Sequence, residues 1–275
     1  GRTGRVHVQR MLAYGTRIVA GISSRAGVGD IEGVPIFADC AAAVAATGAE
    51  ASLAMVPPNG VLAAVEEALR AGIRLIVTVA EGVPVHDAIA IGRMVRNAGA
   101  TWVGASTPGL AVPGEMKLGF LPNVSLRPGP LAMMAKSGTL SYETGYRLAS
   151  LGIGQSLWIG VGGDPVKGIR FPELLPMFLR DGRTRGIVLI GEVGGSEEEE
   201  FADALKTANT SMPVYALVAG QGAKEGVSMG HAGALVFGDV GTYQSKKARL
   251  EAAGARVFAT IEDIVTACRR DHTPR

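Results

Sequence analysis

Short apolar runs alternate with longer segments of helical spacing along most of this chain. In the first half, apolar runs of strand length occupy residues 16–21, 51–56, 75–79 and 101–103. Between them, residues 60–71 and 84–98 carry apolar side chains at helical intervals. Strands that alternate with helices build a parallel sheet covered on both faces, so we predict an α/β fold.

A stretch rich in turn-forming residues, 122–130 (PNVSLRPGP), interrupts this alternation, which restarts after it. We therefore predict two α/β domains, residues 1–127 and 128–275. Strands of the second domain are expected at residues 131–135, 156–161, 186–191 and 214–219. Its helices are expected from about Thr139, at 171–180 and at 197–208.

Charge and composition exclude several classes of function. The 27 basic and 25 acidic residues leave a net charge of only +2, and aromatic residues make up 5%, so no nucleic-acid partner is expected. The two cysteines, Cys40 and Cys268, lie outside any CxxC or Cys/His cluster, which argues against a zinc site and a disulfide. No apolar run is long enough to span a membrane, so we expect a cytoplasmic protein with reduced thiols.

Glycine-rich turns are the first candidates for ligand binding. Residues 1–5 (GRTGR) form a turn before a helix that ends near Tyr14, and such a turn exposes N–H groups and the positive end of the helix dipole to a phosphate. An ordinary βα turn is the alternative. Further turns follow predicted strands at residues 21–29, 56–60, 79–84 and 104–109. They should line one crevice for a nucleotide-like ligand, beyond the carboxyl ends of the strands.

In the second half, Ser137, Gly138 and Thr139 occupy a predicted strand-to-helix turn within KSGTLSYE. Their amides and hydroxyls would form either an anion site or a simple helix N-cap made by Ser137 or Thr139.

Glu192 and His231 are the candidates for nucleophilic chemistry. Glu192 ends a predicted strand, where its carboxylate could accept a ring N–H of a histidine and orient the ring. The run 197–200 (EEEE) that follows is interpreted as acidic decoration of a helix's first turn. His231 lies among small residues (SMGHAGA), so we expect it to be exposed on a flexible loop. A turn histidine without a role is the alternative.

Four segments together resemble the alpha subunits of the succinyl-CoA synthetase family, and the resemblance runs nearly end to end. They are SGTLSYE at 137–143, GVGGDP at 160–165, IGEVGGSEEEE at 190–200 and MGHAGA at 229–234. The resemblance implies a Rossmann-like CoA-binding domain followed by a flavodoxin-like ligase domain. It also implies that a carboxylic acid, CoA and a nucleoside triphosphate give acyl-CoA, diphosphate and phosphate, through an acyl phosphate and a phosphohistidine.

The resemblance further implies roles for residues. His231 would carry the phosphoryl group, Glu192 would support the phosphohistidine, and the turn at Ser137, Gly138 and Thr139 would hold the phosphate, with Tyr142 on the substrate side. Residues that match CoA-contacting segments are Thr3, Gly4, Arg5, Val79, Ala80 and Glu81. Mg-ATP or Mg-GTP is expected on a separate beta subunit of ATP-grasp type, and no metal ion is expected on this chain.

The chain departs from the family pattern in its first domain. Its CoA loop is shorter after Gly4, and Ala26 stands where the family has lysine, with Arg25 beside it as a substitute. Residues 106–109 read Ser-Thr-Pro-Gly where the family reads Asn-Cys-Pro-Gly. Because of these departures the acid need not be succinate, which is the default that the resemblance implies, and malate and citrate are the alternatives.

Two other classes of function remain as rivals. One is a non-catalytic CoA-binding module, to which the altered CoA loop would belong. The other is an NAD-dependent dehydrogenase, which needs an acidic residue after the second strand, where the chain offers only Asp30, late and in a loop.

Overall fold

A computed structural model describes residues 2–23, 27–227, 229–236, 238 and 241–272. The helices are α1 (Arg2–Ala13), α2 (Cys40–Thr47), η1 (Pro58–Gly60), α3 (Val61–Arg70), α4 (Val85–Asn97), η2 (Asn123–Ser125), α5 (Gly138–Ser150), α6 (Phe171–Arg180), α7 (Glu197–Ala208), α8 (Tyr243–Ala252) and α9 (Ile261–His272). The strands are β1 (Gly21–Ile22), β2 (Ile36–Phe37), β3 (Ala51–Ala54), β4 (Leu75–Thr78), β5 (Thr101–Gly104), β6 (Gly109–Val112), β7 (Met116–Gly119), β8 (Pro128–Ala135), β9 (Gln155–Gly160), β10 (Gly186–Glu192), β11 (Val214–Ala219) and β12 (Arg256–Phe258).

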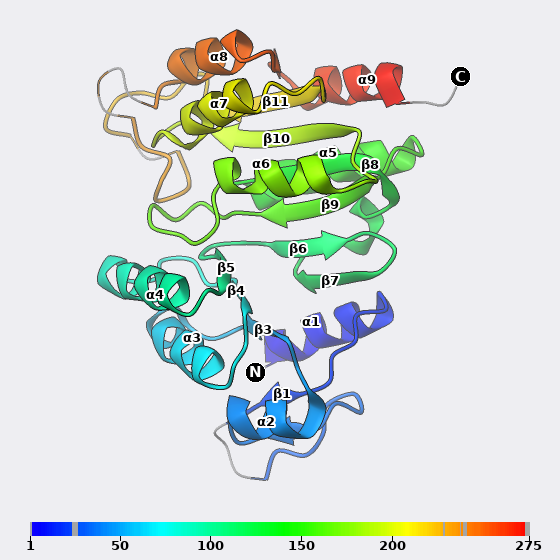
Figure 1. The fold of residues 1–275 in the computed structure, drawn as a ribbon, viewed down its shortest axis with the longest axis vertical. Coiled ribbons are helices and arrows are strands. Elements are labelled where there is room, and N and C mark those ends of the chain that lie inside the picture. The colour runs from blue at the N-terminus through cyan, green and yellow to red at the C-terminus, as the bar shows by residue number, and fades with distance from the viewer. Residues whose placement is uncertain (1, 24–26, 228, 237, 239–240, 273–275) are drawn as a thin grey trace.

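The second half of the chain builds a seven-stranded sheet in the order β12-β11-β10-β8-β9-β6-β7 (Figure 1). Strands β8 to β12 are parallel, and their order is that of flavodoxin-like folds. The predicted flavodoxin-like fold is confirmed. The pattern did not reveal β6 and β7, a short antiparallel hairpin that joins the sheet beside β9. These strands precede residue 128, the predicted start of the second domain, and the domain extents stay a prediction.

Helices cover both faces of this sheet because buried residues alternate along its strands. On β10, Ile187 and Leu189 belong to the core that includes Phe201 of α7. Val188 and Ile190 belong to a second core, which includes residues of α5 and α9. The continuous apolar run of β10 is therefore the mark of a strand buried on both sides, as the sequence predicts.

The first half contains the predicted alternation of strands and helices, with β3, β4 and β5 in one parallel sheet. Its core joins α3 and α4 to Ile76 of β4 and Trp102 of β5. Val77 and Val103, however, belong to the same core as the second sheet, so the two halves pack against each other. The predicted Rossmann-like character is confirmed in this βαβαβ unit.

Two expectations for the start of the chain are wrong. Residues 16–20 form no strand, and only Gly21 of the predicted run lies in β1, which pairs with β2 in a separate sheet. Thr16 instead exchanges two hydrogen bonds with the backbone of Lys117, at 2.8 and 3.0 Å, which ties this segment to β7. The expected turn at residues 1–5 is also wrong, because helical backbone begins at Arg2.

Candidate functional site

His231 and Glu192 lie in direct contact at the carboxyl end of β10. The Nδ1 atom of His231 is 2.7 Å from Oε2 of Glu192. Glu192 is the last residue of β10, and its side chain is only 8% exposed. Because a carboxylate accepts hydrogen bonds and cannot donate them, Nδ1 carries the shared proton and Nε2 carries the lone pair of the neutral ring.

A glycine makes room for this ring. A Cβ atom on Gly163 would lie 2.6 Å from both Cγ and Nδ1 of His231, so a side chain there would displace the imidazole. The loop is also held by its backbone, since Gly233 donates to Gly163 at 3.1 Å and Ala234 donates to His231 at 3.0 Å. His231 is therefore half-buried, with 28% of its side chain exposed, and the expectation of an exposed histidine is corrected.

The surroundings of His231 favour its protonated form. The hydrogen bond that His231 donates to Glu192 raises the pKa of the imidazole, partial burial opposes this, and the charges of Glu192 and Glu81 raise the pKa further. The nearby ammonium group of Lys167 acts in the opposite direction. The result is a pKa above the ordinary value of 6.5.

Asp164 links this site to the first half of the chain. Its two carboxylate oxygens accept the backbone N–H of Gly82 at 3.2 and 3.4 Å. Burial raises the pKa of Asp164, while hydrogen bonds from the backbone of Gly82 and Val83 lower it. The tether brings the segment after β4, with Val79, Ala80 and Glu81, up to the loop that supports His231.

The amino end of α1 lies near that same edge of the first sheet. A Cβ on Gly4 would be 4.0 Å from the sulfur of Met55, the residue that follows β3 by one position, and β3 pairs with β4. The structure therefore brings Gly4 to the strand ends where Val79 to Glu81 are found. Arg5 lies in α1 and is exposed. Gly1, Arg25 and Ala26 lie outside the described residues, as does the side chain of Thr3.

The turn at Ser137, Gly138 and Thr139 forms the start of α5. Ser137 is the N-cap, and its Oγ accepts the N–H of Leu140 at 3.3 Å, so the turn caps the helix, while anion binding there stays a prediction. The hydroxyl of Tyr142 packs over Gly138, and burial raises the pKa of Tyr142 to about 12, so its phenol stays protonated. Because β8 pairs with β10, the start of α5 lies beside the strand that ends at Glu192.

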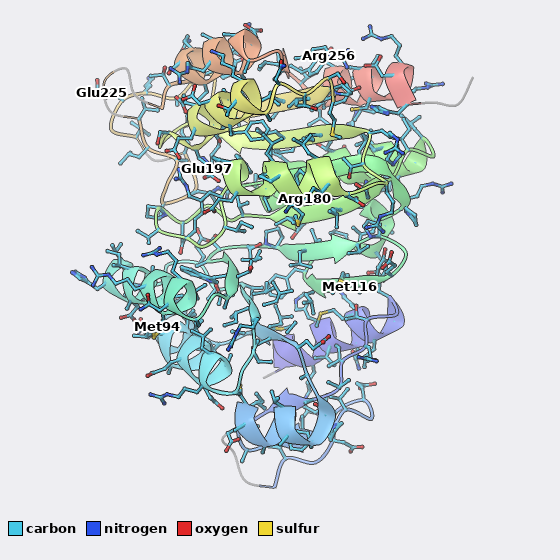
Figure 2. All side chains as sticks on the ribbon, in the orientation of Figure 1. Met94, Met116, Arg180, Glu197, Glu225 and Arg256 are labelled. Atoms are coloured by element: carbon cyan, nitrogen blue, oxygen red, sulfur yellow. The ribbon has the colours of Figure 1, made fainter. Side chains whose placement is uncertain are left out.

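The prediction that the acidic run at residues 197–200 only decorates the first turn of a helix is wrong. Glu197 and Glu198 are 3% and 0% exposed, so they do not decorate a solvated helix end. Lysines that are themselves buried neutralise them: Lys136 lies 2.9 Å from Glu198, Lys167 lies 2.7 Å from Glu197, and Lys246 also bonds to Glu198. Figure 2 shows Glu197 where α6 and α7 lie together. No local pattern predicts these pairs, since each lysine is distant in sequence.

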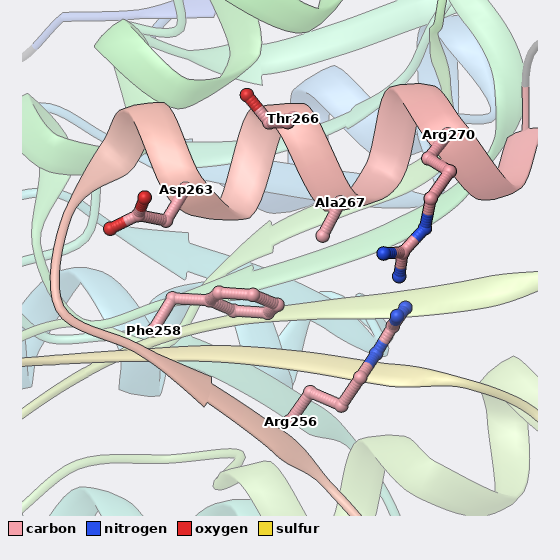
Figure 3. A pocket seen from close by; sticks show the side chains of 6 residues that line it. All are labelled: Arg256, Phe258, Asp263, Thr266, Ala267 and Arg270. Atoms are coloured by element: carbon pink, nitrogen blue, oxygen red, sulfur yellow. The ribbon is translucent and has the colours of Figure 1, made fainter.

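A pocket of about 310 Å³ lies elsewhere, between β12 and α9 (Figure 3). The guanidinium groups of Arg256 and Arg270 point toward each other across it, and both bond to Asp271. Arg256 pairs with Tyr215 near the amino end of β11, whereas Glu192 pairs with Ala219 at its carboxyl end. This pocket is thus separate from the site around His231.

The described ranges offer neither a candidate metal centre nor a membrane-spanning helix. They contain no group of three or more His, Cys, Asp or Glu side chains arranged to hold a metal ion. Nor do they contain a helix with the length and apolar character needed to cross a membrane.

Comparison with known proteins identifies both halves. Residues 1–82 match the family model described as CoA binding domain, and residues 134–256 match the model described as CoA-ligase. The chain is 41% identical, over 98% of its length and 92% of the relative's, to "Succinate--CoA ligase [ADP-forming] subunit alpha 1" of Archaeoglobus fulgidus. It is 42% identical to the corresponding alpha subunit of Aquifex aeolicus, over 94% of this chain and 85% of that one.

Solved structures give a consistent result. ATP citrate lyase from Methanothrix soehngenii, in complex with citrate and coenzyme A, matches with a TM-score of 0.78 and 25% identity, over 86% of this chain and 41% of that longer one. A dinucleotide-forming acetyl-coenzyme A synthetase from Ca. Korarchaeum cryptofilum matches with a TM-score of 0.76 and 20% identity, over 94% of this chain and 55% of that one, which shows a shared fold.

Proposed function

This chain belongs to the family of succinate–CoA ligase alpha subunits, and we propose that within it His231 accepts and returns a phosphoryl group through Nε2. The chain is accordingly part of an acid–thiol ligase that uses CoA as a substrate. The observation that carries the proposal for His231 is the 2.7 Å contact between its Nδ1 and Glu192. That contact directs the lone pair of the neutral ring to Nε2 and stabilises the positive charge that grows on the ring during attack.

The proposed reaction has three steps, in which the phosphoryl group passes from the nucleotide to His231 and then to the acid before CoA displaces phosphate. Nε2 of His231 attacks the γ-phosphorus of a nucleoside triphosphate, an N–P bond forms, the P–O bond to the β-phosphate breaks, and nucleoside diphosphate leaves. A carboxylate oxygen of the acid then attacks the same phosphorus, which breaks the N–P bond, releases His231 and forms an acyl phosphate. The sulfur of CoA attacks the acyl carbon, phosphate leaves, and the thiol proton passes to solvent.

The amino end of α5 is proposed to hold the phosphoryl group beside His231. The first N–H groups of a helix and its dipole attract anions, and Ser137, Gly138 and Thr139 form that end of α5. Support comes from the pairing of β8, which leads into α5, with β10, which ends at Glu192. Tyr142 lies one turn further along α5 and would face the acid.

CoA is proposed to bind at the strand ends of the first sheet, through Thr3, Gly4 and Arg5 of α1, Arg25, and Val79, Ala80 and Glu81 after β4. The tether from Asp164 to Gly82 supports this placement, because it draws the segment after β4 toward His231, where the thiol must react.

The type of partner subunit, the identity of the acid and the cellular compartment are further parts of the proposal. Relatives named alpha subunits imply a beta subunit, and we propose that it is of ATP-grasp type and binds Mg-ATP or Mg-GTP. Succinate is the proposed acid on the names of the relatives, and citrate is the alternative that the ATP citrate lyase match supports, with malate a further one. The cytoplasm is the proposed compartment.

Mapping of phosphate tests the role of His231. We would co-purify the chain with its ATP-grasp beta subunit, incubate the complex with Mg-ATP, and locate acid-labile phosphate by mass spectrometry. Phosphate is expected on His231 and absent from His231→Asn, whereas His272→Asn, which alters a histidine on α9, should keep it. A well-formed complex without phosphate would contradict the proposal and favour a CoA-binding module without the chemistry.

A further inference from the structure

Glu198 holds the backbone of the residue that contacts His231. Its Oε1 accepts the backbone N–H of Glu192 at 3.1 Å. The two residues are six positions apart, with Glu198 in the first turn of α7 and Glu192 at the end of β10. A Cβ on Gly191 would lie 2.6 Å from the same Oε1, so the carboxylate packs directly against the last residues of the strand.

Two lysines from other elements fix the carboxylate of Glu198 in place. Lys136, which follows β8, places its Nζ 2.9 Å from Oε1 and 3.0 Å from Oε2 of Glu198. Lys246 of α8 also bonds to Oε2, and its Nζ donates to the carbonyl of Gly195 at 3.0 Å. All three side chains are buried, so water does not compete for these bonds.

The buried lysines around Glu198 pair with glutamates other than Glu192, so the carboxylate of Glu192 can contact His231. The buried lysines Lys136, Lys167 and Lys246 form ion pairs with Glu197, Glu198 and Glu199. Among the described residues, the ion pairs of these lysines do not include Glu192, whose charge acts on Lys136 only at longer range and whose carboxylate contacts the imidazole. Burial alone would raise the pKa of Glu198, but the two lysines keep it below the usual range, so the side chain stays ionised as an acceptor.

We propose that Glu198 is a positioning residue for the phosphoryl-transfer site: by accepting the N–H of Glu192 it fixes the carboxylate that orients His231. Lys136 and Lys246 serve this role by holding Glu198. The catalytic part of this inference rests on the proposed function of His231, whereas the effect on the geometry of Glu192 and His231 does not. The two can therefore be tested separately.

A matched pair of double variants isolates the hydrogen bond to Glu192. Glu198→Gln with Lys246→Met and Glu198→Met with Lys246→Met each remove one negative and one positive charge. Only the first retains a side-chain oxygen that can accept the N–H of Glu192. Glu198→Asp is a further variant, which keeps the charge but withdraws the acceptor by one methylene group. It replaces the methionine variant should that protein not fold, as judged by thermal unfolding.

The first readout is the pKa of His231, which NMR measures in a pH titration of the full chain without its partner. Among the described residues, the charged groups that influence this ring include Glu192, Glu81, Asp164 and Lys167, and none of them is altered. We expect the variants without the acceptor to titrate at a lower pH than the glutamine double variant, because Glu192 is no longer held against Nδ1. An identical titration in both double variants would overturn the proposal.

The second readout is the initial rate of His231 phosphorylation by Mg-ATP in the complex with the beta subunit. Loss of the outer hydrogen bonds that orient metal ligands commonly costs about 10- to 100-fold in activity. By analogy, we expect the methionine double variant to be phosphorylated at a rate roughly tenfold below that of the glutamine double variant. Equal rates in the two double variants would also overturn the role of Glu198. A wild-type complex that takes up no phosphate would refute the function of His231 instead, and the titration would still decide whether Glu198 positions Glu192.

Discussion

The two ends of the seven-stranded sheet each hold a half-buried histidine, yet the two rings are tuned in opposite directions. At the carboxyl end, Glu192 bonds to His231 and raises its pKa. At the amino end, the hydroxyl of Tyr215 lies 2.9 Å from Nε2 of His272. Burial lowers the pKa of that ring, the charge of Asp271 opposes this, and the charge of Arg256 lowers the pKa further. The comparison teaches that a carboxylate bonded directly to the ring outweighs the effect of burial on the pKa of a histidine, whereas a carboxylate that acts only through its charge does not.

The charged groups at the two ends also differ in their access to water. Lys246 and Glu198 are fully buried, and each depends on the other for compensation. Arg256 and Asp271 form their ion pair at the surface, with 37% and 27% of their side chains exposed. A buried pair is costly to break because the remaining charge is left without water, whereas a surface pair contributes little.

Removal of one buried lysine should have the largest effect. We expect Lys246→Met to lower the free energy of unfolding by about 3 kcal/mol, because Glu198 and Glu199 lose a shared cation in the interior. Lys247→Met is the matched control on the same helix, since Lys247 is 44% exposed and lies 3.8 Å from Glu251, and its cost should stay below about 1 kcal/mol. Denaturant unfolding measures both, and equal costs would remove the contrast between buried and exposed pairs.

Loss of the charge on Glu192 should have the next largest effect, which is on activity and not on stability. Glu192→Gln keeps the size of the side chain but no longer stabilises the positive ring, so we expect the rate of His231 phosphorylation to fall roughly 100-fold. A quenched-flow assay with Mg-ATP and the beta subunit measures this rate. Asp271→Asn, which alters the other end of the sheet, should leave it within about twofold. A similar fall in both variants would indicate general damage to the fold.

The pH dependence of phosphorylation should distinguish the two histidines further. Only the neutral ring of His231 has a lone pair on Nε2, so the rate should fall as the pH drops through its pKa, by about tenfold for each pH unit below it. Because that pKa is raised, the midpoint should lie above 6.5 in the wild type and move down in Glu192→Gln. A wild-type midpoint below 6.5, the direction in which His272 is shifted, would contradict the assignment.

The smallest effect is expected at the amino end of the sheet. Tyr215→Phe removes the hydroxyl that donates to Asp271 at 2.9 Å and contacts His272. We expect a loss of about 1 kcal/mol in the free energy of unfolding, and no change in the rate of His231 phosphorylation. Thermal unfolding and the phosphorylation assay test the two parts, and a slower rate would show that the two ends are coupled.

Many helices and strands in the second half of the fold could be predicted from the sequence. The limits of α6, α7 and β11 agree with the predicted ranges, because their apolar residues repeat at the interval of one element type. The antiparallel strands β6 and β7 were not predicted, since each has four residues and draws its stability from β9, which lies further along the chain. The strand predicted at residues 16–20 is absent for a related reason, because Thr16 bonds to Lys117, about a hundred positions away.

The sequence by itself determined the α/β architecture, the family, and the candidates Glu192 and His231, because periodicity and short motifs are properties of neighbouring residues. The tertiary structure alone decided which charged residues leave water. Glu198 resembles its neighbours in the acidic run, yet its partners Lys136 and Lys246 are 62 and 48 positions away. Folding brings them together at the carboxyl end of the sheet, and the high cost of an unpaired buried charge makes each of these residues depend on the others.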